Sequence, residues 1–592
     1  MPKNVILGIS CFNHDAAASL IVDDQLIAMA EEERFNGQKH TAAVPIKAMH
    51  YCLDEAGLTP KDVQEIVFYF NPWLCLLQYL LKNNPLSLLY DFGRWHRKRF
   101  WFEAVWLTKF WINILYLPRT LGCSSAKLHY ANHSWCHILY GFFCAKEDSP
   151  IVLSNDSIGE NTGAHAVVGH LTTNPDGTRS LGDLKTLIKQ SDPHSIGYLY
   201  GAITQHLGFK RGHGEGKVMA LSSFETETNL QKPLDTFFQN HVLLRRKGTF
   251  SFSRQLMLER SFSPAAERLS KKALAILGDK RISSDSIDRK HYAISKALQN
   301  ATNALVDHQV DYLKKIREIR EIVHVGGVAQ NSVSNGFISC KHNDISFNVP
   351  PIPHDAGCAI GAALSGYYNR KKSLPPFKET AFLGGKISTT RVKEKLVLYG
   401  ISNKITVLQN EKEAINAVVK DLCEGKVIAL FNDRMECGPR ALGNRSILAD
   451  PRCMNMKDNL NTKIKFRELF RPYGGVCMAK YASNLFEGMP TRDISKYMTH
   501  VLTVKKSMQN KIPALVHVDK TCRVQLVSAD MLPFIDKILL QFYKKTGVPM
   551  LVNTSFNVRG EPICRTVEDA LSAFYTSGID SLMFNFAVKV EK

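Results

Sequence analysis

The chain has 592 residues, of which 45% are hydrophobic and 22% are charged. This is a globular composition rather than that of a disordered chain, and the length predicts roughly two to four domains. The 75 lysines and arginines outnumber the 55 acidic residues, and the resulting net charge of +20 favours anionic partners. Nucleotides, nucleic acid, phosphorylated substrates and an acidic membrane surface all remain open.

The predicted elements alternate between short apolar strands and helices. Apolar runs predict strands at 5–10 and 19–32, and helical periodicity follows at 45–58. The same alternation continues with a strand at 151–156, a helix over 283–315, a strand at 321–325, a loop leading into a helix at 349–368, and a strand at 426–431. Strands that end in glycine or aspartate loops and alternate with helices predict an α/β layer structure. Charge and prolines in NRKKSLPPFKET (369–380) predict a domain boundary.

The cysteines and the first residues bear on location. The 14 cysteines are scattered and none belongs to a C-x-x-C pair, which argues against a zinc ribbon or a thioredoxin-like motif. We therefore expect reduced thiols and a cytoplasmic protein. The opening MPKNVILGISCFNHDAA lacks a signal-peptide pattern, because its apolar stretch is short and His14 and Asp15 follow at once.

The segment 68–117 is rich in apolar, aromatic and basic residues. Lys82, Lys109 and the basic cluster at 94–99 interrupt it, so no uncharged run reaches the roughly 18 residues of a membrane span. We expect helices that pack on the domain. The alternative is an interfacial helix on anionic lipid, which leaves a peripheral membrane contact open.

The most metal-like feature is NHSWCHI, in which His133 and His137 are four residues apart. On a helix this spacing places both imidazoles on one face, where they can share a cation. Asp156 and Asp355 each follow an apolar strand-like run, and two histidines with carboxylates suit iron, zinc or manganese better than calcium. Ordinary surface or core histidines, with helix-capping aspartates, are the alternative.

Two glycine loops are candidates for phosphate binding. VGGVAQNSVSNG contains Gly326, Gly327 and Asn331, and GHGEGKVMA places Lys217 among glycines. Such loops can present backbone N–H groups to an anion, although each is equally compatible with a tight turn.

The last third of the chain is dense in cations and polar donors. These are Arg440 and Arg445 in GPRALGNRSILADPR, Lys465, Arg467 and Arg471 in KIKFRELFRPY, Arg523 in HVDKTCRVQ, and Asn553, Ser555 and Asn557 in LVNTSFNVRGEPI. Guanidinium groups pair with phosphate oxygens, so this set predicts a small phosphorylated ligand. A solvated basic face is the alternative, and nucleic acid is not expected because the segments lack interleaved aromatics.

Eleven segments, taken in order, resemble the NodU/CmcH-type O-carbamoyltransferases. They are GISCFNHDAAASL, EEERFNGQKH, NHSWCH, NDSIGE, GEGKVMAL, GGVAQNSVSN, PHDAGCAIGAAL, ECGPRALGNRSILADPR, KIKFRELFRP, HVDKTCRVQ and NTSFNVRGEPI. The resemblance implies an actin/sugar-kinase/heat-shock-like domain over 1–372 and a YrdC-like α/β domain over 388–592.

The resemblance also implies the chemistry. The second domain makes carbamoyl-adenylate from carbamoyl phosphate and ATP, and the first, with a divalent metal for which iron is expected, passes the carbamoyl group to a hydroxyl. The implied metal ligands are His133, His137, Asp156 and Asp355. The residues implied to bind carbamoyl phosphate are Arg440, Lys465, Arg471, Arg523 and Ser555. His14 follows the first strand and is hypothesised to be the general base or an orienting group.

We therefore expect an ATP-dependent carbamoyltransferase acting on a small metabolite or a saccharide. A tRNA threonylcarbamoyl-type modification enzyme and a non-catalytic nucleotide-binding protein are the alternatives. A homodimer is left open.

Overall fold

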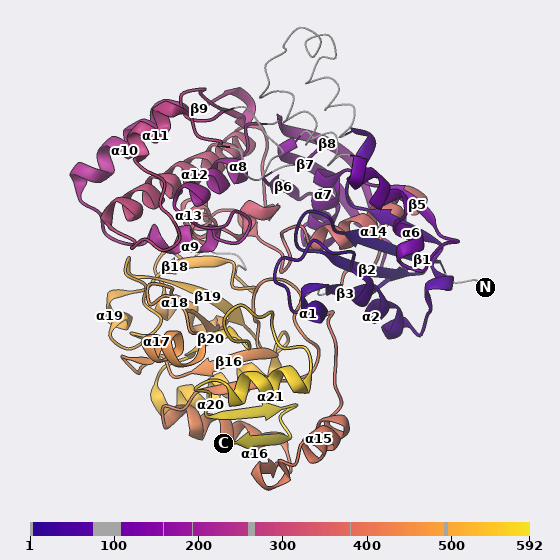
Figure 1. Ribbon diagram of the computed structural model, residues 1–592, viewed down its shortest axis with the longest axis vertical. Coiled ribbons are helices and arrows are strands. Elements are labelled where there is room, and N and C mark those ends of the chain that lie inside the picture. The colour runs from indigo at the N-terminus through magenta and orange to yellow at the C-terminus, as the bar shows by residue number, and fades with distance from the viewer. Residues whose placement is uncertain are drawn as a thin grey trace.

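The computed structural model describes residues 4–592 except 75–107, 158, 161, 192, 259–266, 379–380 and 490–494. Figure 1 shows three lobes: the N-terminal residues form the upper and right-hand lobes, and the C-terminal residues form the lower one. The strands belong to one sheet of five, one of six, one of nine and a two-stranded ribbon. The chain is thus a mixed α/β protein, as predicted.

The five-stranded sheet has the order β3-β2-β1-β4-β5. Its strands are β1 (Val5–Ser10), β2 (Ala17–Val22), β3 (Gln25–Glu31), β4 (Glu65–Phe68) and β5 (Lys127–Tyr130). The single strand predicted at 19–32 is two strands, because Asp23 turns with a φ of 53° and starts a hairpin. Helix α2 (Ile46–Ala56) packs on β2 and β3, and α14 (Gly357–Lys371) packs on β1. Gly8 permits that approach, since a Cβ there would lie 2.0 Å from the Ala359 carbonyl oxygen.

The six-stranded sheet has the order β12-β11-β6-β7-β8-β13. Its strands are β6 (Ile151–Asn155), β7 (Thr162–Thr173), β8 (Arg179–Ser191), β11 (Glu321–Val325), β12 (Ser346–Asn348) and β13 (Ser373–Leu374). Helix α7 (His133–Cys144) contacts β6, β7, β11 and α14, so it lies between the two sheets.

Helices cover the six-stranded sheet on its far side and form the upper lobe in Figure 1. They are α8 (Ile196–His206), α9 (Glu215–Leu221), α10 (Thr228–His241), α11 (Lys271–Leu277), α12 (Arg289–Ile316) and α13 (Ser332–Lys341), with the ribbon β9 (Val242–Leu244) and β10 (Phe250–Phe252). The helix predicted from 283 begins at Arg289 instead, because the Asp288 side chain accepts hydrogen bonds from the N–H groups of Lys290 and His291 and caps it there.

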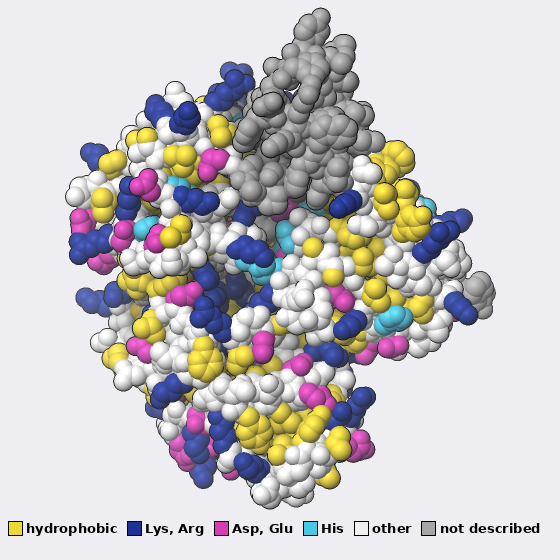
Figure 2. Space-filling model, viewed as in Figure 1, with side chains coloured by type: hydrophobic (Ala, Val, Ile, Leu, Met, Phe, Trp, Pro, Cys, Tyr) yellow, Lys and Arg dark blue, Asp and Glu magenta, His cyan; other side chains and the backbone are white. Residues whose placement is uncertain are grey.

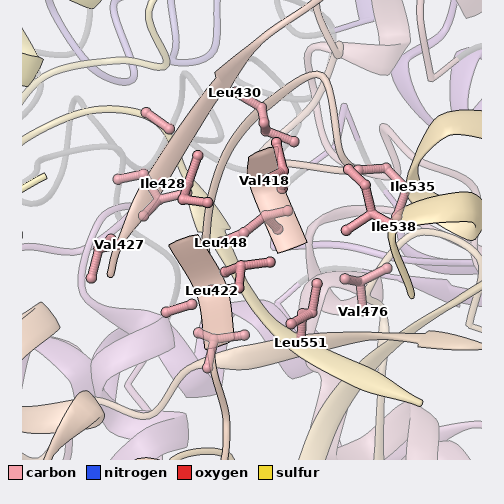
Figure 3. Close-up of a cluster of buried hydrophobic side chains, with 14 of the residues drawn as sticks. Val418, Leu422, Val427, Ile428, Leu430, Leu448, Val476, Ile535, Ile538 and Leu551 are labelled. Atoms are coloured by element: carbon pink, nitrogen blue, oxygen red, sulfur yellow. The ribbon is translucent and has the colours of Figure 1, made fainter. Parts of the chain in front are cut away.

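The nine-stranded sheet has the order β14-β22-β21-β15-β16-β20-β17-β19-β18. Its strands are β14 (Ile405–Val407), β15 (Ile428–Phe431), β16 (Arg445–Ala449), β17 (Gly474–Met478), β18 (His500–Thr503), β19 (Thr521–Val527), β20 (Met550–Ser555), β21 (Ser581–Phe584) and β22 (Val588–Glu591). Helices α16 (Glu411–Cys423) and α20 (Pro533–Thr546) pack on this sheet and against each other. Figure 3 shows their contribution, with Val418 and Ile535 meeting strand residues such as Leu448 in a fully buried core.

The remaining helical segments are short. They are α1 (Glu33–Asn36), η1 (Pro60–Asp62), α6 (Leu117–Thr120), η2 (Arg246–Gly248), η3 (Gly327–Gln330), α15 (Thr389–Leu398), η4 (Ser402–Lys404), α17 (Met456–Asn459), η5 (Leu460–Ile464), η6 (Ala479–Tyr481), α18 (Ala482–Leu485), α19 (Lys506–Gln509) and α21 (Val567–Tyr575). Among the helices that the structure describes, none is long and apolar enough to cross a membrane. Most of the aromatic, basic segment 68–117 lies outside the described residues.

The C-terminal lobe docks on the N-terminal part in two places. At the first, α13 packs on β18, and the Asn335 side chain donates to the Thr499 carbonyl at 2.9 Å. Gly336 lies so close that a Cβ there would come within 1.9 Å of the Val501 carbonyl oxygen. At the second, the loop 432–444 reaches into the core beneath the five-stranded sheet, where Cys437 is buried.

Candidate functional site

Four side chains predicted as metal ligands converge between the two N-terminal sheets. One donor atom from each of His133, His137, Asp156 and Asp355 lies within 4.8 Å of every other. His133 Nε2 is 2.7 Å from Asp156 Oδ2, and His137 Nε2 is 3.6 Å from the same oxygen. Both imidazoles also lie 3.7 Å from Asp355 Oδ1. The arrangement brings two nitrogens and two carboxylates around one point.

Local sequence explains why these side chains meet. Asn132 caps α7 by accepting from the Trp135 N–H, so the helix begins at His133 and its first turn presents both histidines on one face. Asp156 follows the last residue of β6, and Asp355 precedes α14. Each aspartate therefore sits at a strand or helix terminus that points toward the N-terminal end of α7.

The cluster has the properties of a cation site. His137 is fully buried, and neither ring nitrogen has a hydrogen-bond partner among the described residues. Burial by itself lowers the pKa of His137, but the carboxylates of Asp156 and Asp355 outweigh it and raise the pKa to about 9. A divalent ion would satisfy the unpartnered nitrogen and neutralise the carboxylates, and a donor set of two imidazoles and two carboxylates suits zinc, iron or manganese.

His14 lies beside this cluster and is held by an aspartate. Its Nδ1 is 2.8 Å from Asp15 Oδ2, and Asp15 Oδ1 is 2.6 Å from His40 Nδ1. The other nitrogen of His14 is 3.8 Å from Asp355 Oδ2. Burial lowers the pKa of His14, yet Asp355 and Asp15 together raise it to about 10. When Asp15 accepts a hydrogen bond from Nδ1–H of neutral His14, its Nε2 faces the cluster with a free lone pair.

The second set of predicted residues converges in the C-terminal lobe. Burial lowers the pKa of Arg523 well below its usual value, and the neighbouring cations Arg440 and Arg467 lower it further. Burial and then Arg467 lower the pKa of Arg471 to about 10, and burial lowers that of Arg440 to about 10. The guanidinium groups of Arg440, Arg467, Arg471 and Arg523, which we call the cation group, thus lie near one another, and among the described residues Glu468 alone does not balance their charge. A polyanionic ligand is the natural complement.

Lys465 is anchored at the edge of this cation group by β20 and the residues after it. Its ammonium donates to Asn557 Oδ1 at 2.7 Å, to the Asn557 carbonyl at 3.0 Å and to Ser555 Oγ at 3.3 Å. The Ser555 hydroxyl in turn donates to Asn557 Oδ1 at 2.7 Å. Burial, then Arg467, lowers the pKa of Lys465 well below its usual value. Lys465, Ser555 and Asn557 therefore form one hydrogen-bonded unit.

Two lysines of the N-terminal part, Lys217 and Lys39, lie beside the cation group. Lys217, on α9, pairs with Glu468 at 2.7 Å, and Glu468 is 3.9 Å from Arg471. Lys39 is exposed, but desolvation by the surrounding protein lowers its pKa to about 8, and Arg471 and Arg467 add to the lowering. In Figure 2 lysine and arginine side chains gather around a hollow near the centre of the face, with histidines beside it. The cation group lies at the junction of the lobes.

Arg440 is carried to that junction by a docked loop. The Gly438 N–H donates to Glu31 Oε2 at 3.1 Å, and the Gly438 carbonyl accepts from Arg34 Nη2 at 2.7 Å. Arg34 and Glu31 also pair with each other at 2.8 Å. Gly438 has a φ of 96°, and a Cβ there would lie 2.5 Å from the Pro351 carbonyl oxygen, so only glycine fits.

Some predicted binding residues are engaged by the protein itself. The Arg445 guanidinium lies 3.7 Å from the centre of the Phe431 ring and donates to backbone carbonyls, including that of Asp433 at 3.1 Å. The Asn553 side chain donates to Gln525 Oε1 at 2.9 Å. In this structure these side chains support the loop and the sheet, and their contact with a ligand stays a prediction.

The glycine loop at 326–331 packs beside Asp156, one of the four candidate metal ligands. The Gly327 N–H donates to Asp156 Oδ1 at 3.1 Å, and the Asn331 side chain caps α13 while pairing with Gln299 at 2.9 Å. Gly326 has a φ of 90° and lies against Asn155, whose carbonyl oxygen would be 2.2 Å from a Cβ. In this structure the loop positions Asp156.

Sequence reasoning missed several residues of the site. Asp15 and His40 orient His14, and Lys39 joins the cation group from the other domain. Glu160 accepts the His133 N–H at 2.9 Å and the Asn71 N–H at 2.8 Å, and so fixes the start of α7. The segments EEERFNGQKH and NDSIGE carried the family resemblance and contained some of these residues, but spacing alone gave them no role.

The sequence comparisons bear on the same two regions. The pattern described as "Carbamoyltransferase N-terminus" matches residues 5–364, and the one described as "Carbamoyltransferase C-terminus" matches residues 419–590. The chain belongs to the carbamoyltransferase family. It is therefore a transferase enzyme, as predicted, and both the metal-type cluster and the cation group lie within the matched residues.

Two relatives match nearly the whole chain in sequence, whereas a solved structure matches it only weakly. An uncharacterized protein of Synechocystis is 30% identical over 98% of this chain and 96% of its own length. Nodulation protein NolNO of Sinorhizobium fredii is 29% identical over 97% of this chain and 78% of its own. HypF of T. kodakarensis is 13% identical, covers 62% of this chain and 48% of its own, and has a TM-score of 0.29, which carries no argument. The actin-like and YrdC-like domain assignments therefore stay predictions.

Proposed function

We propose that this carbamoyltransferase makes carbamoyl-adenylate from carbamoyl phosphate and ATP in the C-terminal cation group, and transfers the carbamoyl group to a hydroxyl at the His/Asp cluster. The acceptor is a small metabolite or a saccharide. The observation that carries the proposal is the convergence of Arg440, Arg467, Arg471 and Arg523. Arg523 on β19 is in register with Gly474, three residues after Arg471, and Arg440 and Arg467 lower the pKa of Arg523. Carbamoyl phosphate is small and doubly negative, and such a group of fixed cations matches it.

In the proposed activation step, the carbamoyl group is moved from phosphate to adenylate. Water hydrolyses carbamoyl phosphate to carbamate and inorganic phosphate. A carbamate oxygen then attacks the α-phosphorus of ATP, the bond to pyrophosphate breaks, and carbamoyl-adenylate forms. Arg440 and Arg523 hold phosphate oxygens, and the unit of Lys465 with Ser555 orients the nucleotide phosphates. The cations stabilise the negative charge that develops on the departing phosphate and pyrophosphate. Adenylate then becomes the leaving group for the second step.

In the proposed transfer step the acceptor oxygen attacks the carbamoyl carbon, and the bond to adenylate breaks. With a divalent ion held by Asp355 and Asp156, the negative charge that raises the pKa of His14 would be offset and the imidazole would be neutral. Neutral His14 would then accept the hydroxyl proton on Nε2, and Asp15, 2.8 Å from its other nitrogen, would stabilise the imidazolium. His133, His137, Asp156 and Asp355 would hold the divalent ion, and iron is the ion we propose. When bound, such an ion supplies Lewis-acid stabilisation of charge on oxygen.

Segment 39–40 connects the two proposed sites. His40 contacts Asp15, which contacts His14 at the metal cluster, while the adjacent Lys39 belongs to the cation group. A short path between the sites protects a labile mixed anhydride from bulk water. This continuity favours one enzyme with two steps over a non-catalytic nucleotide-binding protein.

The test follows pyrophosphate release with carbamoyl phosphate and ATP, and then carbamoyl mass gain on extracted metabolites and glycans. We expect Arg523→Gln to abolish pyrophosphate release, and His14→Ala to keep that release while losing transfer to any acceptor. Arg391→Gln, on α15 and outside the site, is the matched control. Pyrophosphate release that needs tRNA, or that survives Arg523→Gln, would contradict the proposal.

A further inference from the structure

The helix at 108–115 and α6 after it present an outward apolar face. Ile112 is 49% exposed, Leu115 is 57% exposed and Tyr116 is 53% exposed. Their spacing, with Lys109 and Arg119 one turn to either side, places them along one side of a continuous helical path. We call these five residues the outer face.

The inner side of this path is already packed. Ile114 and Leu117 are fully buried in the core of the five-stranded sheet. The buried inner side is enough to anchor this helix to the protein. The apolar side chains on its outer side are therefore not needed for folding. The outer face therefore has the composition of a surface that another phase or molecule covers.

An aromatic side chain extends the outer face. Trp73 is 59% exposed, and its ring lies 4.3 Å from that of Trp111. Its backbone N–H donates to Asn71 Oδ1 at 3.1 Å, and the Asn71 N–H donates to Glu160 at 2.8 Å. Trp73 is thus held in place by the hydrogen bonds that also fix the start of α7.

The charge on this segment points to an anionic partner. Residues 108–120 contain Lys109 and Arg119 and no acidic residue, and Lys127 is exposed on β5 close behind. The Arg119 guanidinium lies 5.6 Å from the centre of the Tyr116 ring, so charge and aromatic surface are paired. Cations at the ends of an apolar stretch, with tryptophan and tyrosine beside it, match the boundary between lipid headgroups and acyl chains.

We propose that the outer face and Trp73 dock the protein on a bilayer that carries anionic lipid headgroups. Ile112 and Leu115 enter the acyl boundary, and Lys109 and Arg119 remain among the headgroups. The proposal rests on this surface alone and is independent of the proposed reaction.

The test is flotation of the full-length protein with vesicles of phosphatidylcholine, alone or mixed with phosphatidylserine. We expect binding to the mixed vesicles only. Lys109→Gln with Arg119→Gln should lower the partition coefficient about 25-fold, since each basic residue near an anionic surface contributes about fivefold. Ile112→Gln with Leu115→Gln should lower it roughly tenfold or more.

The matched control is Val397→Gln with Leu398→Gln on α15, because these side chains are 60% and 72% exposed at a distant apolar site. The control should bind vesicles as the wild type does, and all variants should unfold at the wild-type temperature. Absence of binding to the mixed vesicles overturns the proposal, as does equal loss in the control. A wild-type dimer in sedimentation that Ile112→Gln with Leu115→Gln dissociates would also overturn it, since a second copy would then cover the face.

Discussion

Replacement of Gly438 by alanine tests whether the docked loop holds Arg440 in position within the cation group. An L-residue at a φ of 96° costs roughly 1–2 kcal/mol. The new Cβ would lie 2.5 Å from the Pro351 carbonyl oxygen, against the 3.4 Å at which ordinary contact begins, so the backbone must move by 3.4 − 2.5 = 0.9 Å. That shift weakens the hydrogen bonds to Glu31 and Arg34, each worth about 1.5–3 kcal/mol when one partner is charged.

We therefore expect Gly438→Ala to destabilise loop docking by about 3–5 kcal/mol and to displace Arg440, two residues later. The assay is calorimetric binding of inorganic phosphate together with the KM for carbamoyl phosphate in pyrophosphate release, and both should weaken by about tenfold or more. Gly547→Ala is the matched control, since its φ is 73° and no atom lies within 4 Å of its Cβ. It should lose stability to urea but keep phosphate affinity. Equal phosphate affinity in both variants would refute the reasoning.

The His/Asp cluster, the junction of the lobes and a buried histidine give three further tests. His137→Ala should lose most of the divalent ion that the purified protein retains after dialysis, whereas His129→Ala, at a half-exposed position on β5, should retain it. Lys217→Met should lower the free energy of unfolding by about 1 kcal/mol, because its partly exposed pair with Glu468 is a tie between the lobes; a loss of several kcal/mol would contradict this. Burial lowers the pKa of His500 from 6.5 to about 4, so its contribution to stability is complete above pH 6.5 and disappears as the pH falls toward 4; urea titrations should show a shallower acid-side slope for His500→Gln.

Local patterns predicted the elements and the metal-type cluster well. The four-residue spacing of His133 and His137 is satisfied by α7, and the aspartates lie at the element ends where apolar runs stopped. These features depend on periodicity and on where strands end, which a sequence carries directly. The hairpin at Asp23 was missed because two strands joined by two residues have the same apolar content as one long strand.

The residues that join distant segments could not be predicted in the same way. Lys39 and Arg471 are more than four hundred positions apart, and only the docking of loop 432–444 on Glu31 and Arg34 brings their segments together. Arg445 shows why cation-rich composition alone does not assign a contact. Its segment is rich in cations, but β16 directs its guanidinium to backbone carbonyls and to the Phe431 ring, and composition does not record direction.

The same docking explains why the cation group sits where two lobes meet. Arg440 and Arg523 are partly buried near each other, and their repulsion opposes the folded arrangement. The charged pair of Arg34 with Glu31 offsets this repulsion from the N-terminal side, because it forms hydrogen bonds with both the N–H and the carbonyl of Gly438. An anion bound among the arginines would reduce this repulsion, so anion binding and lobe docking would stabilise each other. Docking of the lobes is therefore needed to assemble the cation group, since neither lobe alone supplies both Lys39 and Arg471.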